Sequence, residues 1–365
     1  MGKYKVAIIG CGRVAVKHLK AISKLKERVE LIAVADTNVD GAKKLLTERG
    51  FVGVQIFKDY EEMINTAKPD ICAITVPSGL HYPIAKLCMI NGINILLEKP
   101  MTMSADESRE LYELSNLTGV KVAMGHIYRY FPIVGILRQD LADGIFGKIT
   151  HGTICVRWGH DQDYYDSAAW RGTWKSDGGA LMNQSIHAID LLLWLMSANA
   201  VEVNAMLARR LRNIEAEDVG TALMKLDTGA LAILEGTTAT LSSEKEAMFS
   251  IFCEKGSVSL GLHRGKPSLN IRNEKGRSLN MHYIIKQLKL GGFKSYSYAL
   301  NPHTGIYADL IRALDNNGSP IADAKAGYSS VETLMAIYRS AKEERTIKLP
   351  LEENFASTDM IGFFD

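Results

Sequence analysis

A glycine-rich turn near the start of the chain constrains its fold more than any other feature. Residues 10–15, Gly-Cys-Gly-Arg-Val-Ala, follow a short apolar run and open a helical pattern. This setting matches the GxGxxG/A dinucleotide-binding fingerprint. Gly10 permits the tight turn, Gly12 lets the backbone approach a pyrophosphate, and Ala15 keeps helix and strand close. We therefore expect a cofactor site that includes Gly10, Gly12, Arg13 and Val14.

The rest of the N-terminal part alternates β-rich runs with amphipathic helical patterns. We expect strands at residues 5–9, 29–35, 71–75, 94–97 and 121–124. We expect helices at residues 17–25, 40–48, 60–66, 82–91 and 105–118. This order is typical of right-handed βαβ units and predicts an α/β fold with a doubly wound parallel Rossmann sheet. We assign residues 1–122 to this domain.

Long strand patterns dominate after residue 146. We expect strands at residues 149–159, 201–211, 219–226, 230–239, 247–253 and 257–262, with a hairpin turn at 227–229. Helices are expected at residues 187–196, 304–316 and 328–344. Residues 123–365 are thus predicted to form an α+β substrate domain with an open, mostly antiparallel sheet, whose last helices can pack on the first domain.

The composition excludes several classes of protein. Among 365 residues, 43 basic and 41 acidic side chains leave a net charge of +2, which favours neither nucleic acid nor a membrane surface. The five cysteines form no CxxC pair, so we expect no disulfide framework and no metal site. No apolar run reaches the roughly 18 residues of a membrane span, and no export signal is visible. We expect a soluble, cytoplasmic protein.

Asp36 predicts the kind of dinucleotide. It ends the second predicted strand, where a carboxylate accepts both ribose hydroxyls and repels a 2′-phosphate. Thr37 and Asn38 follow, where an arginine would favour NADP. We therefore predict NAD. The alternative is that Asp36 only caps the next helix.

Glu98-Lys99-Pro100 follows an apolar strand at the carboxyl edge of the predicted parallel sheet, where ligands bind. Pro100 removes a backbone donor and biases Lys99 towards an extended conformation. Taken alone, such a lysine is more often a solvated loop cation.

A second polar pattern lies in residues 178–190. Asn183, His187 and Asp190 are four and three residues apart, so they share one helical face. The glycines at 178 and 179 allow close approach to this face. A lone histidine here would more often be a satisfied core residue, but three polar groups in an apolar helix are harder to explain structurally.

Together, residues 10–15, 98–100 and 178–190 resemble the Gfo/Idh/MocA oxidoreductases, and the likeness spans essentially the whole chain. The resemblance implies an NAD-dependent enzyme acting on a sugar CH–OH group, with its open sheet used to form a homodimer or homotetramer. It places Lys99 and His187 beside the nicotinamide and the reacting carbon. Asn183 stands where many members carry Asp, which shifts the acid/base role to Lys99 and His187 and leaves open which of them is the base.

A narrower resemblance is to the UDP-N-acetylglucosaminuronate 3-dehydrogenases. It rests on residues 75–81 (Thr-Val-Pro-Ser-Gly-Leu-His), on 170–174 (Trp-Arg-Gly-Thr-Trp) and on Asn183-Gln184-Ser185. It implies oxidation of the C3 hydroxyl of UDP-N-acetyl-D-glucosaminuronate in the synthesis of surface-polysaccharide sugars. The cofactor site would then also include Thr75, Pro77, His81, Glu98 and Lys99. The substrate site would include Tyr165, Trp170, Arg171, Asn183, His187 and His303.

The anionic substrate of this subgroup calls for cations. Arg171 is the first candidate, helped by Arg157, whereas Tyr165 and Trp170 are either stacking groups or core aromatics. Residues 286–298 are either a flexible substrate loop or a solvated lysine-rich segment.

Two other functions compete with this prediction. The same fold could oxidise UDP-N-acetylglucosamine, a free sugar or an inositol. Alternatively, the chain could be a non-catalytic NAD-binding regulator, because a Rossmann fold alone does not imply catalysis.

Overall fold

The computed structural model describes residues 2–365, apart from the side chains of residues 291–299. The chain forms two compact units. The first contains the residues up to Thr102, Glu107–Tyr130 and Tyr296–Tyr328. The second contains Met103–Asp106, Phe131–Ser295 and Ser329–Asp365. The sequence predicts a single division after residue 122, whereas the first unit also takes in a later segment that carries helix α10 (Pro302–Asp315).

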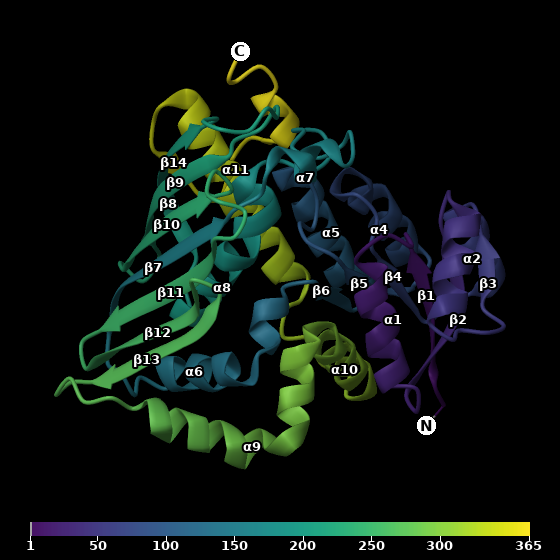
Figure 1. Cartoon of the computed structure of the whole chain (residues 1–365), viewed down its shortest axis with the longest axis horizontal. Coiled ribbons are helices and arrows are strands. Elements are labelled where there is room, and N and C mark those ends of the chain that lie inside the picture. Colours follow the sequence, from purple (N-terminus) through teal and green to yellow (C-terminus); the bar gives the residue numbers. More distant parts are fainter. Residues whose placement is uncertain (1) are drawn as a thin grey trace. The chain divides into compact units, whose positions relative to one another are not determined.

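A six-stranded sheet forms the centre of the first unit (Figure 1). Its strands are β1 (Tyr4–Ile9), β2 (Val29–Ala35), β3 (Gln55–Phe57), β4 (Ile71–Ile74), β5 (Asn94–Leu97) and β6 (Val122–Met124). They lie in the order β3-β2-β1-β4-β5-β6, and every neighbouring pair is parallel. The predicted doubly wound Rossmann sheet is thus confirmed. Strand β3, which is only three residues long, was not predicted.

The helices of the first unit begin and end close to their predicted positions. They are α1 (Ala15–Lys24), α2 (Val39–Glu48), α3 (Tyr60–Ala67), α4 (His81–Ile90) and α5 (Ala105–Thr118). Local capping explains two of the starts: the Asn38 side chain accepts the Gly41 amide before α2, and Asp59 accepts the amides of Glu61 and Glu62 before α3. Helix α10 lies beside α1 in the same unit (Figure 1), where His18 of α1 contacts Tyr307 of α10.

An eight-stranded sheet forms the second unit. Its strands are β7 (Ile149–Trp158), β8 (Ala200–Ala208), β9 (Val219–Leu226), β10 (Leu231–Thr237), β11 (Lys245–Cys253), β12 (Gly256–His263), β13 (Lys266–Asn273) and β14 (Ile347–Lys348). The order is β13-β12-β11-β7-β10-β9-β8-β14. Among these neighbours only β7 and β10 are parallel, so the prediction of a mostly antiparallel sheet is confirmed. The predicted hairpin joins β9 to β10. Strands β13 and β14 were not predicted.

The two faces of this sheet differ. Helix α8 (Ile186–Met196) packs so closely on β7 that a Cβ on Gly152 would lie 2.6 Å from the Met196 sulfur. The opposite face exposes Leu223, Leu231 and Ile233, which are 59%, 56% and 41% accessible. Strand β9 therefore alternates buried and exposed residues, as expected of a sheet with one covered face.

Several helices lie where the sequence analysis expected none. They are α6 (Pro132–Ala142), α7 (Gln162–Asp166) and α9 (Asn280–Leu300). The prediction of a flexible loop at residues 286–298 is wrong, because this segment lies within α9. Lys286 is held by the carboxylate of Asp140 on α6 at 2.6 Å. Helix α11 (Ala324–Glu343) was predicted a few residues shorter at its start. No helix in the described part of the chain is long and apolar enough to cross a membrane.

Candidate active site

The turn after β1 meets the end of β4 at the point where the strand order of the first sheet reverses. Gly10 has a φ of +94°, and a Cβ on it would lie 3.0 Å from the carbonyl carbon and oxygen of Thr75. The Thr75 hydroxyl donates to the Gly10 carbonyl at 2.5 Å. Ligands of doubly wound sheets bind outside the strand ends at this reversal. Only glycine fits the conformation and the contact at position 10.

Gly12 is needed for a different reason. A Cβ on Gly12 would meet no protein atom within 4 Å, so packing within the chain does not require a glycine there. Gly12 and Arg13 are exposed, and Val14 is the N-cap residue of α1. The space beside Gly12 at this helix N-terminus fits the approach of a pyrophosphate, as the dinucleotide fingerprint predicts.

Asp36 lies against the same turn. Its Oδ2 accepts the Cys11 amide at 2.6 Å and its Oδ1 accepts the Asn38 amide at 2.7 Å. The alternative in which Asp36 only caps α2 is wrong, because Asn38 is the N-cap residue. Each carboxylate oxygen keeps a second lone pair. The turn and this carboxylate therefore fit an NAD molecule.

The loop after β4 carries Pro77, which is exposed, and ends at His81, which is buried. The His81 Nδ1 lies 2.7 Å from the carbonyl of Pro100, and its Nε2 lies 3.0 Å from the carbonyl of Val76. Burial lowers the pKa of His81, and its bonds to the two carbonyls raise it less. The ring thus contacts both loops that follow β4 and β5.

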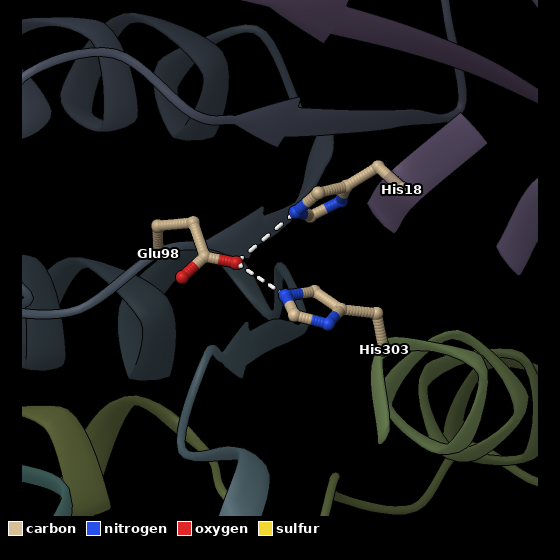
Figure 2. A group of neighbouring side chains, drawn as sticks. All are labelled: His18, Glu98 and His303. Atoms are coloured by element: carbon tan, nitrogen blue, oxygen red, sulfur yellow. Dashed lines mark hydrogen bonds and ion pairs between the residues drawn. The ribbon is translucent and has the colours of Figure 1, made fainter. Parts of the chain in front are cut away.

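A buried carboxylate lies at the end of β5. Glu98 is only 9% exposed, and its Oε1 is 3.0 Å from both the Nε2 of His18 and the Nε2 of His303 (Figure 2). A carboxylate only accepts hydrogen bonds, so both rings donate. Burial alone would raise the pKa of Glu98, but the bonds from the two histidines outweigh it and hold that pKa well below its usual range. Glu98 is therefore a fixed anion.

This cluster joins three elements of the first unit: α1 carries His18, β5 leads to Glu98, and α10 carries His303. His303 was predicted to bind substrate, and His18 was not predicted as a site residue. A histidine on the apolar face of α1, between Ala15 and Ile22, was the signal that could have revealed it. Lys99, the next residue after Glu98, is half-buried at this sheet edge and precedes a cis peptide bond to Pro100.

The polar helix face predicted in the second unit begins in a π-helical turn, η3 (Leu181–Ser185), which leads directly into α8. Asn183 lies in this turn and His187 in the first turn of α8, and both are half-buried. Asp190 is buried. π-Helical turns within helices are frequent at functional sites. The structure thus brings Asn183 and His187 together on one continuous helical segment.

Glu217 holds the start of this segment. Its Oε1 accepts the Leu181 amide and the Tyr338 hydroxyl, each at 2.9 Å. A Cβ on Gly179 would overlap both the carbonyl and the carboxylate of Glu217, which explains that glycine. Burial raises the pKa of Glu217 to about 7. Glu217 was not predicted as a site residue, since an acidic residue next to a strand has many other uses.

The amide of Asn183 is fixed on both sides. Its nitrogen donates to the carboxylate of Asp177, and its Oδ1 accepts the Gln184 amide at 2.8 Å. The Gln184 nitrogen also lies 3.3 Å from the Nε2 of His160. Burial, followed by the positive charge of Lys245, lowers the pKa of His160 to about 4. His160 and Asp177 were not predicted as site residues.

An aromatic cluster adjoins this chain of bonds. The Arg171 guanidinium lies 4.4 Å from the Tyr164 ring centre and 4.6 Å from that of Trp170. His160 stacks on Tyr164 at 3.8 Å. Tyr165 is buried and bonds the Thr238 hydroxyl at 2.8 Å. Arg171 and Trp170 thus lie together, half-buried, at the surface of the second unit.

Arg157 lies elsewhere in this unit. It is on β7, and its guanidinium is bound by Glu235 at 2.6 Å and by Glu246 at 3.0 Å. These two carboxylates already neutralise the cation that was expected to help bind an anionic substrate.

Family comparisons agree with this architecture. Residues 4–126 match "Oxidoreductase family, NAD-binding Rossmann fold", and residues 136–259 match "GFO/IDH/MocA C-terminal domain". Among curated proteins, the chain is 23% identical to the D-glucoside 3-dehydrogenase of Escherichia coli over 94% of this chain and 97% of that protein. It is 25% identical to the UDP-N-acetylglucosamine 3-dehydrogenase of Acidithiobacillus ferrooxidans over 63% of this chain and 66% of that protein.

Two similar solved structures carry ligands. The WlbA dehydrogenase from Bordetella pertussis, in complex with NADH and UDP-GlcNAcA, aligns with a TM-score of 0.86 at 29% identity, covering 96% of this chain and 99% of that one. The WlbA dehydrogenase from Chromobacterium violaceum, in complex with the same two molecules, aligns with a TM-score of 0.84 at 30% identity, covering 96% and 97%.

Proposed function

The chain belongs to the Gfo/Idh/MocA family of NAD-dependent sugar oxidoreductases, and we propose that it oxidises the C3 hydroxyl of UDP-N-acetyl-D-glucosaminuronate to a ketone. The observation that carries this proposal is the likeness to both WlbA dehydrogenases over 96% of the chain, because both hold UDP-GlcNAcA. The subgroup residues around Trp170 and Asn183 support it from the sequence. The ketone would be an intermediate in making a surface-polysaccharide sugar.

The reaction removes two hydrogens from the sugar. NAD supplies the acceptor for the hydride that leaves C3. The hydroxyl proton passes to a base, and Lys99 and His187 are the two candidates. A base of this kind contributes about 10²–10⁴-fold to the rate when its pKa lies near the working pH.

The remaining site residues bind and orient. Asp36 accepts the adenosine ribose hydroxyls, and the turn at Gly10 and Gly12 admits the pyrophosphate. Asn183 is a neutral hydrogen-bonding group for the sugar, since its amide is held by Asp177 and Gln184. Arg171 is the cation for the anionic substrate, and its stacking between Tyr164 and Trp170 limits the rotamers that it can adopt.

We also propose that the chain forms a homo-oligomer through the outer face of the eight-stranded sheet. The exposed side chains Leu223, Leu231 and Ile233 lie next to one another there, because β9 and β10 pair Leu223 with Ile233. Contiguous apolar surface of this kind is typical of interfaces. Light scattering of the purified protein distinguishes a dimer or tetramer from a monomer, and only a monomer contradicts the proposal.

The substrate is tested by NADH formation at 340 nm. The panel contains UDP-N-acetylglucosaminuronate, UDP-N-acetylglucosamine, myo-inositol and glucose, each with NAD and with or without a 2-oxo acid to reoxidise retained NADH. Activity on the uronate in preference to the others supports the proposal. Activity on another member of the panel alone replaces the substrate and keeps the enzyme class, whereas inactivity on all of them favours an untested sugar or a regulator.

The residues are tested by Lys99→Met and His187→Ala. Each substitution is expected to reduce kcat by at least about 10²-fold while NADH still binds, as a fluorescence titration would report. Full turnover in both variants would remove both residues from the reaction.

A further inference from the structure

Glu98, the residue before Lys99, is held by more contacts than the end of a strand requires. The Glu98 amide already continues the sheet by donating to the Ile74 carbonyl at 3.1 Å. In addition, its buried side chain contacts two other elements, α1 through His18 and α10 through His303 (Figure 2). A Cβ on Gly125 would lie 2.8 Å from the other carboxylate oxygen, so Glu98 is closely packed on that side too. The backbone that leads into Lys99 is thus held on several sides.

The hydrogen-bond directions in this cluster are determined by its members. Tyr307 lies 3.2 Å from the Nδ1 of His18. Because burial lowers the pKa of His18, its ring is neutral and carries one hydrogen. That hydrogen is on Nε2, which faces the carboxylate, so Nδ1 accepts from the Tyr307 hydroxyl. Among the described residues, the Nδ1 of His303 has no hydrogen-bond partner, whereas its Nε2–H connects α10 directly to Glu98.

We propose that His18 and His303 are positioning residues for Lys99, acting through the Glu98 carboxylate. This inference rests on the proposed role of Lys99 in the reaction. Each histidine presents one N–H to the same oxygen, so Glu98 stays ionised in one rotamer, and the peptide that follows it keeps one course. Displacing a reacting group by about 1 Å can cost on the order of 10²-fold in rate. Two buried donors on one carboxylate prevent such a displacement.

The same three side chains could instead hold a metal ion, since their ligand atoms lie within 4.8 Å of one another. Both Nε2 atoms, however, point at one carboxylate oxygen at hydrogen-bond distance (Figure 2). The two N–H donors account for that geometry without an ion. The zinc content of the purified protein and its activity after EDTA decide between these two arrangements.

The test compares two variants of His303. His303→Phe keeps an aromatic ring but removes the N–H donor. In His303→Gln, the side-chain amide nitrogen can reach the same Glu98 oxygen that His303 contacts. We expect kcat of His303→Phe to fall at least about tenfold, with KM for NAD changed less than threefold. His303→Gln should recover most of the rate. Rates are divided by the number of NADH-binding sites from a fluorescence titration, so that misfolded protein does not count. Whichever sugar the unaltered enzyme oxidises is used, so a wrong substrate assignment does not affect the result.

A second readout does not depend on turnover. Hydrogen–deuterium exchange in the peptide that contains Glu98 should accelerate in His303→Phe and return towards the original rate in His303→Gln. Tyr307→Phe removes the hydrogen bond to the Nδ1 of His18 and should accelerate this exchange less than His303→Phe does. Tyr4→Phe is the matched control, because it removes the 3.0 Å bond between Tyr4 and Asp315 of α10 without touching the cluster.

Three results would overturn the proposal. One is an unchanged rate per NADH site in His303→Phe. Another is a loss of rate that His303→Gln does not restore. The third is one tightly bound zinc per chain whose removal by EDTA reproduces the loss, which would make Glu98 and the histidines metal ligands.

Discussion

The side-chain nitrogen of Asn183 donates a hydrogen bond to the carboxylate of Asp177. Asp177 is only 3% exposed, and its other oxygen accepts the Gly172 amide at 3.0 Å. Asn183 is thus paired with a buried acidic residue that lies six positions earlier in the chain. The side-chain amide of Asn183 is itself neutral, and it is bound to a buried carboxylate.

This arrangement predicts the effect of Asn183→Asp. Two carboxylates would then be in hydrogen-bond contact, and one of them would have to keep a proton. We expect kcat to fall at least about tenfold at pH 8 and to recover partly towards pH 6. A pH–rate profile measures this. The double variant Asp177→Asn with Asn183→Asp exchanges the two groups and should regain activity at pH 8. If activity is not regained, repulsion between the two carboxylates does not cause the loss of kcat.

Gly12→Ala separates cofactor binding from folding. The new Cβ meets no protein atom within 4 Å, so the Tm should change by no more than about 1 °C. KM for NAD should rise at least about tenfold, because the methyl group occupies the space of the pyrophosphate. Gly135→Ala, which also meets nothing but lies within α6, is the control and should leave KM for NAD unchanged. An unaltered KM in Gly12→Ala would contradict this account of the turn.

Asp36→Ala should weaken NAD and admit NADP. The loss of a charge-assisted hydrogen bond to the ribose costs about 1.5–3 kcal/mol, which corresponds to roughly 10- to 100-fold in kcat/KM for NAD. Without the carboxylate, a 2′-phosphate is no longer repelled, so the ratio of NADP to NAD activity should rise. Steady-state kinetics with both cofactors measure it. A variant that still discriminates as strongly would show that another residue selects NAD.

Glu217→Gln should be stabilising, and more so at higher pH. The pKa of Glu217 is about 7 in the folded protein, above its ordinary value, so between these values the folded state binds more protons than the unfolded state. The stability that Glu217 contributes is therefore present at low pH and is lost as pH rises through 7. Relative to the original protein, the variant should gain up to roughly 3 kcal/mol between pH 4.5 and 8. Urea unfolding at several pH values measures this difference, and a pH-independent difference would show that Glu217 is ionised in the folded state.

The sequence predicted the parts of the fold that local pattern determines. The turn at Gly10, the strands around it and the helix that begins near His187 carry their signal within a few consecutive residues. Asp36 was placed correctly at the same sheet edge, because parallel strands end together. Short elements gave no such signal: β3 has three residues and β14 has two, and each forms only because a longer neighbour pairs with it.

Two of the missed site residues, His18 and Glu217, have partners that are distant in the chain. His18 contacts Glu98 80 positions later, and Glu217 contacts Tyr338 121 positions later. No spacing rule connects such pairs in a single sequence. The prediction of a flexible loop at residues 286–298 was wrong for a related reason. The glycines and lysines of this segment suggested a solvated loop, whereas Lys286 is bound by Asp140 of α6, far upstream in the chain.

In the proposed reaction, the hydrogen at C3 of a UDP-uronate leaves as hydride. UDP-N-acetylglucosaminuronate that carries deuterium at C3, mixed with NAD and this enzyme, shows where that hydrogen goes. Mass spectrometry of the NADH formed should show one deuterium, and the sugar product should be a 3-ketone without the label. NADH that contains no deuterium, formed together with a product still labelled at C3, would contradict the account.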